Sequence, residues 1–273
     1  MKRKSISNWL KTVAAVLIIA LHIAPFYIMI NMSLKEASDR SSRWLPAKGF
    51  YIQNYFNAVE TGNLLRALGN TLFIVLCSVA IIVVVGAMAA YPLSRQATRK
   101  NKIILAFIVG IMMVPQLSVL VPLYKELVAM RGVNQYWGII IVSATFNLPM
   151  AIYMYSNFIG TIPKELDEAA MIDGCSRLQV FFQIILPSLK ATTASVIIWT
   201  AVGIWNDYQF QLYFLQKPAL RTITLAITTF FTDSKKDMGA AAAAAFIVVL
   251  PPIIMYIALQ KQFVKGAMDS AVK

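Results

Sequence analysis

The chain has 273 residues, of which 59% are hydrophobic and 14% are charged, and its mean hydropathy is +0.66. These values exclude an ordinary soluble domain and indicate an integral membrane protein. The formal net charge of +13 does not indicate a nucleic-acid-binding protein, because the basic residues are scattered between uncharged runs and form no stripe with interleaved aromatic residues.

Six nearly uncharged runs are long enough to cross a bilayer, which requires roughly 20 apolar residues in a helix. None of them shows the alternation over about ten residues that is typical of β-barrel strands. The sequence therefore predicts an all-α membrane protein with six transmembrane helices. In chain order the runs are 12–33, 71–90, 103–124, 135–162, 191–215, which Asp207 interrupts, and 238–260.

Basic residues 2–4 precede the first run, as they do in a secretory signal peptide. However, the apolar run is longer than the roughly 7 to 15 residues of a cleaved signal, and no small-x-small cleavage site follows Met32. We therefore expect a retained first helix. This divides the chain into an N-terminal segment 1–11, a membrane domain 12–260 and a C-terminal tail 261–273.

Six spans place both termini on the same side of the membrane. The short link 94–102 between the second and third runs carries four basic residues and no acidic residue. Short basic links lie in the cytoplasm according to the positive-inside rule. The sequence therefore predicts that both termini, and the polar loop 161–190, are cytoplasmic.

The outer segment 35–66 carries Trp44, Tyr51 and Tyr55, which suit anchoring at the lipid headgroups. His22 in the first run has no Cys or carboxylate neighbours, so we expect a structural residue and no metal site.

The loop 161–190 is the most polar part of the membrane domain. Pro163 suits the first turn of a helix, and acidic residues 165, 167 and 168 place negative charge at the positive end of its dipole. Gly174 predicts the end of this helix. Ser176, three residues before Gln179, predicts a capping box for a second helix that runs to Pro187.

On the first of these helices, four positions at i, i+3, i+4 and i+7 share one face. They are Leu166, Ala169, Ala170 and Asp173. The two adjacent alanines make this face shallow, so a partner can approach the helix backbone closely. The alternative is a helix that lies on the lipid surface, but such helices are basic on their polar face, whereas this one is acidic.

Asp207 is the only acidic residue inside an apolar run. A charge at mid-membrane costs about 2.5 to 3.5 kcal/mol on insertion scales, so we expect Asp207 to face a cavity or a partner. Its neighbours combine aromatic rings with amides, which can stack on a sugar and form hydrogen bonds with it. Alternatively, the group lies at a helix break and satisfies freed backbone groups. The candidate substrate-path residues are Asn147, Trp205, Asn206, Asp207, Tyr208, Gln209 and Gln211.

The polar loop resembles the EAA signature of bacterial ABC-importer permeases, E-A-A-x3-G-x9-I-x-L-P. Residues 168–170, Gly174, Ile184 and 186–187 match all seven fixed positions. Within that family the chain is similar to the permeases of carbohydrate importers, which resemble the smaller maltose-type permease. The residues that carry this second likeness are 90–91 with 94–95, 205–208, and the tail 260–273, which keeps the family's frame but replaces its Thr and second Gly.

The resemblance implies a type I ABC importer permease fold. It also implies that the signature helix is a coupling helix, seated in a groove of a cytoplasmic ATP-binding subunit. Gly174 is equally compatible with a purely structural role, as a turn residue that requires positive φ. The coupling residues implied by the resemblance are Glu168, Ala169, Ala170, Asp173, Gly174, Leu186 and Pro187.

The chain contains no G-x-x-x-x-G-K-[ST] loop, so we expect no ATPase site and no cofactor of its own. The resemblance implies that partner subunits use ATP and Mg²⁺. The implied partners are a homologous second permease, two ATP-binding subunits and an external solute-binding protein that delivers a sugar or oligosaccharide. The implied location is the prokaryotic plasma (inner) membrane.

Two other classes of protein fit the sequence less well. A self-contained channel or ion-coupled carrier would require several intramembrane charges or an internal repeat, and only Asp207 is clear. A membrane-embedded enzyme would require paired carboxylates, a His cluster or a nucleophile with its base within the spans, and the runs carry no such group.

Overall fold

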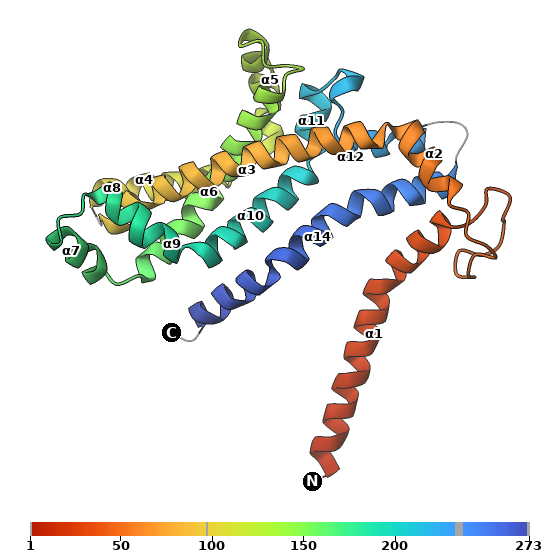
Figure 1. Cartoon of the computed structure of the whole chain (residues 1–273), viewed down its shortest axis with the longest axis horizontal. Helices are drawn as coiled ribbons and strands as arrows, with labels where there is room; N and C mark the ends of the chain where they lie inside the picture. The colour runs from red at the N-terminus through yellow and green to blue at the C-terminus, as the bar shows by residue number, and fades with distance from the viewer. Residues whose placement is uncertain (1, 97, 233–236, 272–273) are drawn as a thin grey trace. The chain divides into compact units, whose positions relative to one another are not determined.

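The computed structural model describes residues 2–96, 98–232 and 237–271, and every regular element in these ranges is a helix or helical turn (Figure 1). The prediction of an all-α fold is confirmed. The helices are α1 (Lys2–Ser33), α2 (Gln53–Gly62), α3 (Leu64–Arg95), α4 (Arg99–Ile111), α5 (Leu120–Ala129), α6 (Tyr136–Thr161), α7 (Glu165–Ile172), α8 (Arg177–Val180), α9 (Leu186–Ser188), α10 (Lys190–Trp205), α11 (Gln209–Phe214), α12 (Ile223–Ile227), α13 (Thr229–Thr232) and α14 (Met238–Ala271). Short 3₁₀ turns cover Gln116–Val119 and Pro218–Leu220, and a π-helical turn covers Phe181–Ile185.

Within the described residues, four helices are long and apolar enough to cross a membrane by length and composition. They correspond to the first, second, fourth and sixth predicted runs and cover Trp9–Ser33, Leu64–Arg95, Tyr136–Thr161 and Met238–Lys261. The third run corresponds to a bent pair of helices. A second bent pair covers Arg177–Ser188 and Lys190–Asn206, so it joins the second helix of the polar loop to the first part of the fifth run. The chain has up to six spans if each pair counts as one.

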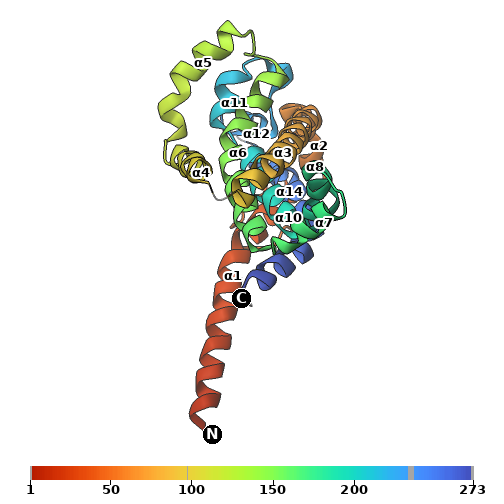
Figure 2. The same ribbon diagram turned by 90° about the vertical axis from the view of Figure 1, so that its left-hand side faces the viewer.

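The third run bends by 92° between Arg99–Ile111 and Gln116–Ala129, a turn that Figure 2 shows between α4 and α5. Pro115 lies at this break with an extended backbone. Proline has no N–H to donate and disfavours a helical conformation in the residue before it. The position of the bend therefore follows from the sequence.

The fifth run starts directly after one bend and contains a break. The bend, of 74°, lies between Arg177–Ser188 and Lys190–Asn206, just before the run begins. Residues 206–208 then separate α10 from α11, so the run 191–215 is not one continuous helix. Asp207 lies in this second break, as the alternative interpretation of that residue expected.

The chain divides into two compact units, Met1–Arg66 with Ala226–Leu250 and Ala67–Leu225 with Pro251–Lys273. In the second unit, α3 and α6 pack side by side in the same direction. Ser78 Oγ donates to the Ile140 carbonyl at 3.4 Å, and Ser94 Oγ donates to the Ser156 carbonyl at 2.9 Å. Both helices therefore end on the same side of this unit, next to the polar loop that follows α6.

Helix α10 packs against α6 in the opposite direction. The Tyr155 hydroxyl donates to Thr193 Oγ1 at 3.1 Å near the start of α10. Towards the end of α10, Gly203 faces Asn147, because a Cβ at position 203 would lie 3.7 Å from Asn147 Oδ1. These two contacts fix the register of the pair and bring Asn147 close to the break that holds Asp207.

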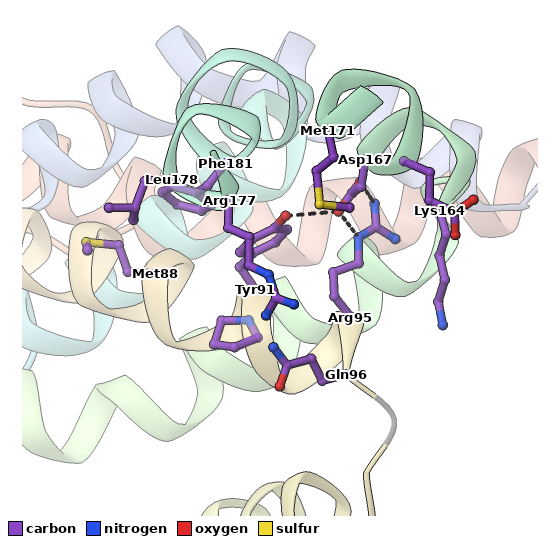
Figure 3. Close-up of a pocket in the computed structure, with 12 residues that line it drawn as sticks. Met88, Tyr91, Arg95, Gln96, Lys164, Asp167, Met171, Arg177, Leu178 and Phe181 are labelled. Carbon is purple, nitrogen blue, oxygen red and sulfur yellow. Dashed lines mark hydrogen bonds and ion pairs between the residues drawn. The ribbon is translucent and has the colours of Figure 1, made fainter. Parts of the chain in front are cut away.

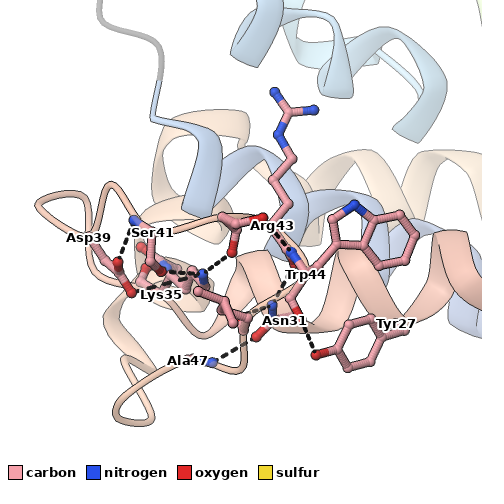
Figure 4. Close-up of polar contacts among 11 residues, drawn as sticks. Tyr27, Asn31, Lys35, Asp39, Ser41, Arg43, Trp44 and Ala47 are labelled. Carbon is pink, nitrogen blue, oxygen red and sulfur yellow. Dashed lines mark hydrogen bonds and ion pairs between the residues drawn. The ribbon is translucent and has the colours of Figure 1, made fainter.

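In the first unit, the loop 34–52 after α1 is held by hydrogen bonds to its backbone (Figure 4). Asn31 Nδ2 donates to the carbonyls of Arg43 and Leu45, each at 2.7 Å, and Asn31 Oδ1 accepts from the Ala47 N–H. The Tyr27 hydroxyl donates to the Trp44 carbonyl at 2.9 Å. One amide on α1 therefore fixes three points of the loop.

Lys35 is buried in the same loop and donates to Ser41 Oγ and to the Ser42 carbonyl. Hydrogen bonds from the side chain and backbone of Ser41 lower the pKa of Asp39, whose carboxylate lies 4.0 Å from Lys35 Nζ. The Trp44 ring is exposed, and its anchoring role at the headgroups stays a prediction.

Candidate functional site

The polar loop forms the helix, turn and helix that its sequence predicts. Helix α7 ends at Ile172, and Gly174 has a φ of +87°. Ser176 Oγ accepts from the Gln179 N–H while Gln179 Oε1 accepts from the Ser176 N–H, which completes the capping box. Pro163 lies two residues before α7 and outside its first turn, which corrects the predicted helix start.

The second helix of the loop continues to Pro187 with one irregularity. Helix α8 leads into the π-helical turn Phe181–Ile185, and α9 follows with Pro187 in its first turn. Single π turns inside α-helices occur frequently at functional sites. Leu186 is partly exposed and Pro187 is exposed, so both predicted coupling residues remain accessible at the end of the loop.

Helix α7 is held against α3 by a buried ion pair (Figure 3). Arg95 at the end of α3 donates from Nη2 to Asp167 Oδ1 at 2.9 Å and from Nε to Asp167 Oδ2 at 3.0 Å. The Tyr91 hydroxyl donates to the same Oδ2 at 3.0 Å. Bidentate pairs between arginine and a carboxylate are strong and directional, so this contact fixes both the position and the orientation of α7.

The same arginine also reaches the end of α6. Arg95 Nη1 donates to the carbonyl oxygens of Ile159 and Ile162, at 3.1 Å and 2.7 Å. One guanidinium therefore joins α3, α6 and α7. Sequence reasoning gave no role to this pair; the available signal was a basic residue at the end of a span and an acidic residue in the next loop on the same side.

The exposed face of α7 differs from the predicted docking face. Leu166, Ala169 and Asp173 are exposed as predicted, but Ala170 is only 7% exposed. The reason is that Ala170 lies one turn after Asp167, whose ion pair turns that side of the helix inward. Ile172, with 86% of its surface exposed, takes its place on the outer face.

A second polar feature lies at the break after α10. A cavity of about 520 Å³ is bounded by α6, α10 and the break, and Asp207 lines it. Asp207 Oδ1 accepts from the Phe210 N–H at 3.2 Å and so caps the start of α11. Asp207 Oδ2 is buried and has no hydrogen-bond partner among the described residues.

The structure separates the candidate substrate-path residues. Asn147 and Asp207 line the cavity, whereas Trp205, Asn206, Tyr208, Gln209 and Gln211 do not. Gln211 is fully buried and binds the Ile204 carbonyl and two threonine hydroxyls, so its role is structural. The lining residues that the sequence reasoning missed include Gln116, Ser143, Trp199 and Gly203.

Comparison with known proteins decides the family. Residues 54–267 match the model of the binding-protein-dependent transport system inner membrane component. The chain belongs to this family. The predicted resemblance to ABC-importer permeases is therefore confirmed.

The relatives include two named permeases. The melibiose/raffinose/stachyose import permease protein MelC of Bacillus subtilis is 39% identical over 96% of this chain and 95% of its own length. The probable starch degradation products transport system permease protein AmyC of Thermoanaerobacterium thermosulfurigenes is 32% identical over the full length of both chains. The family and its apolar helices identify this chain as a multi-pass membrane protein of the permease class.

A solved structure shares the fold. A chain of a bacterial ABC transporter involved in the import of the acidic polysaccharide alginate superposes with a TM-score of 0.83, at 19% identity, over 96% of this chain and 98% of the other. This likeness confirms the expected ABC-importer permease fold.

Proposed function

We propose that this chain is a permease subunit of an ATP-driven importer for a sugar or oligosaccharide. The observation that carries this proposal is the 39% identity with MelC over nearly the whole of both chains. The second relative, AmyC, is named for starch degradation products. Two relatives with carbohydrate cargo support the same cargo class for this chain.

Energy reaches the permease through α7. The exposed Leu166, Ala169 and Ile172 form a shallow apolar face, and Glu165 in the first turn adds charge at its edge. This face suits a groove on a partner ATP-binding subunit. Because Asp167 is bound to Arg95, a displacement of α7 moves the end of α3 with it.

The partners follow from this assignment. They are a homologous second permease, two ATP-binding subunits that use ATP and Mg²⁺, and a solute-binding protein that delivers the cargo outside. The basic link 94–102 favours cytoplasmic termini. The tail 260–273 also carries the resemblance, and its side chains from residue 262 onward lie outside the described residues.

The cavity at Asp207 belongs to the cargo path in this proposal. Its polar lining comes from Gln116, Ser143, Asn147 and Asp207, and the rings of Phe146, Trp199 and Phe210 provide walls. Rings with a few convergent polar groups are typical of small-molecule sites. A buried carboxylate oxygen without a partner suits the hydroxyl groups of a sugar, because each hydroxyl can donate to it.

The test is ATP hydrolysis by the reconstituted complex, with binding protein and a panel that starts with melibiose, raffinose and stachyose. One of the carbohydrates should stimulate hydrolysis in the wild type. Ala169→Lys, on the exposed face of α7, should abolish the stimulation while the subunit stays inserted. Ala129→Lys, at the exposed end of α5, is the matched control and should leave it unchanged. Full stimulation in Ala169→Lys would refute the coupling assignment.

A further inference from the structure

A pocket of about 420 Å³ lies between the end of α3 and helices α7 and α8 (Figure 3). Met88, Leu178 and Phe181 form its apolar part, and the rings of Tyr91 and Pro92 continue it. The transport function proposed above uses the Arg95–Asp167 pair on the wall of this pocket but assigns the pocket no ligand.

Two cations of this pocket are not neutralised. The side chains of Lys164 and Arg177 are exposed and form no hydrogen bond or ion pair within the described part of the chain, and in Figure 3 they extend toward the same side of the pocket. Arg95, by contrast, is balanced by Asp167. Glu168 is the one other carboxylate of the lining in the described residues, so the lining keeps a net positive charge.

The pocket lies where a membrane span meets water. Helix α3 is one of the long apolar helices and ends at Arg95. The link that follows adds three exposed cations, Arg99, Lys100 and Lys102. Basic pockets between spans at the membrane surface bind anionic lipid headgroups, and basic residues next to a span are attracted to an anionic leaflet.

We propose that this pocket binds an anionic phospholipid, with its phosphate held by Lys164 and Arg177 and an acyl chain on Met88, Leu178 and Phe181. The apolar lining favours a lipid over free phosphate, because a lipid can bury an acyl chain against this lining and inorganic phosphate has no apolar group. A lipid in this pocket contacts Tyr91, which is bound to Asp167. The lipid therefore supports the contact that holds α7 against α3.

The test measures lipid binding directly, without ATP or sugar, so its outcome is independent of the transport function proposed above. The full chain, with the subunits that purify with it, is titrated in detergent with phosphatidylglycerol or phosphatidylcholine, and bound lipids are counted by native mass spectrometry. One phosphatidylglycerol should bind more tightly than phosphatidylcholine. Lys164→Gln with Arg177→Gln should weaken phosphatidylglycerol binding by about 25-fold, given roughly fivefold per basic residue.

The control variant is Lys125→Gln with Arg131→Gln. It removes the same charge from two exposed positions that precede the N-terminus of α6, whereas the pocket lies near the C-terminus of that helix. Phosphatidylglycerol binding should stay unchanged in this variant. Leu178→Gln, which keeps the charge, should weaken both lipids. Equal affinity of the wild type for the two lipids, or an equal loss in the control, would overturn the proposal. So would full competition by inorganic phosphate.

Discussion

Asp167 and Asp207 differ in how fully their carboxylate oxygens are bound. Both oxygens of Asp167 accept hydrogen bonds, from Arg95 and Tyr91. Asp207 uses one oxygen to cap α11 and leaves the other without a partner among the described residues. A buried charge whose hydrogen bonds are all made holds structural elements together. A buried charge that lacks a partner is stabilised when a ligand donates a hydrogen bond to it. The first carboxylate is therefore a fixed joint and the second a candidate binding group.

The largest effect is expected at the joint. Asp167→Ala leaves the Arg95 guanidinium buried without its counter-charge, and breaking a buried pair in this way costs about 3 to 5 kcal/mol. We expect a lower melting temperature of the complex and loss of ATPase stimulation by cargo. Glu126→Ala removes an exposed carboxylate from α5, away from the docking face, and should change neither quantity. Equal effects of the two substitutions would show that Asp167 is not a joint.

A smaller effect is expected at the cavity. Asp207→Asn keeps an oxygen for the Phe210 N–H but removes the charge that is available to cargo. A hydrogen bond to a charged group contributes about 1.5 to 3 kcal/mol, which corresponds to a loss of about 10- to 100-fold in cargo uptake at low concentration. The melting temperature should stay close to that of the wild type. Asn206→Ala, outside the cavity, is the control, and unchanged uptake by Asp207→Asn would remove Asp207 from the cargo path.

The smallest effect is expected for Tyr91→Phe. This change removes one of the hydrogen bonds to Asp167 and keeps the bidentate pair with Arg95. Since Tyr91 is partly exposed, water can replace the hydroxyl, and the expected loss of stability is about 1 kcal/mol. Thermal unfolding of the complex measures it. A loss as large as that of Asp167→Ala would mean that Tyr91, rather than Arg95, is the main partner.

The sequence predicted the features that neighbouring residues determine. The stop at Gly174 and the capping box of Ser176 with Gln179 depend on contacts within a few residues. The pairing of Arg95 with Asp167 spans 72 positions, so no local pattern contains it. That pairing also decides which side of α7 faces inward, which is why the burial of Ala170 was missed.

The cavity shows the same limit. Asp207 was found because a lone charge in an apolar run is conspicuous. Its neighbours in sequence point in different directions once the helix breaks, so proximity along the chain grouped with Asp207 residues that do not line the cavity, such as Gln211. The actual lining comes from residues brought together by the packing of α6 against α10, such as Ser143 and Gly203. Helical spacing relates Ser143 to Asn147, which was the one available signal.

Helix α7 should move together with the end of α3 when the partner ATPase closes. The direct measurement is the distance between spin labels at Met171 on α7 and Leu76 on α3, both exposed, by pulsed electron paramagnetic resonance in the nucleotide-free and the ATP-trapped complex. We expect the same distance distribution in both states of the wild type, and a broader distribution in Asp167→Ala. A distance that changes between the two states of the wild type would contradict this expectation.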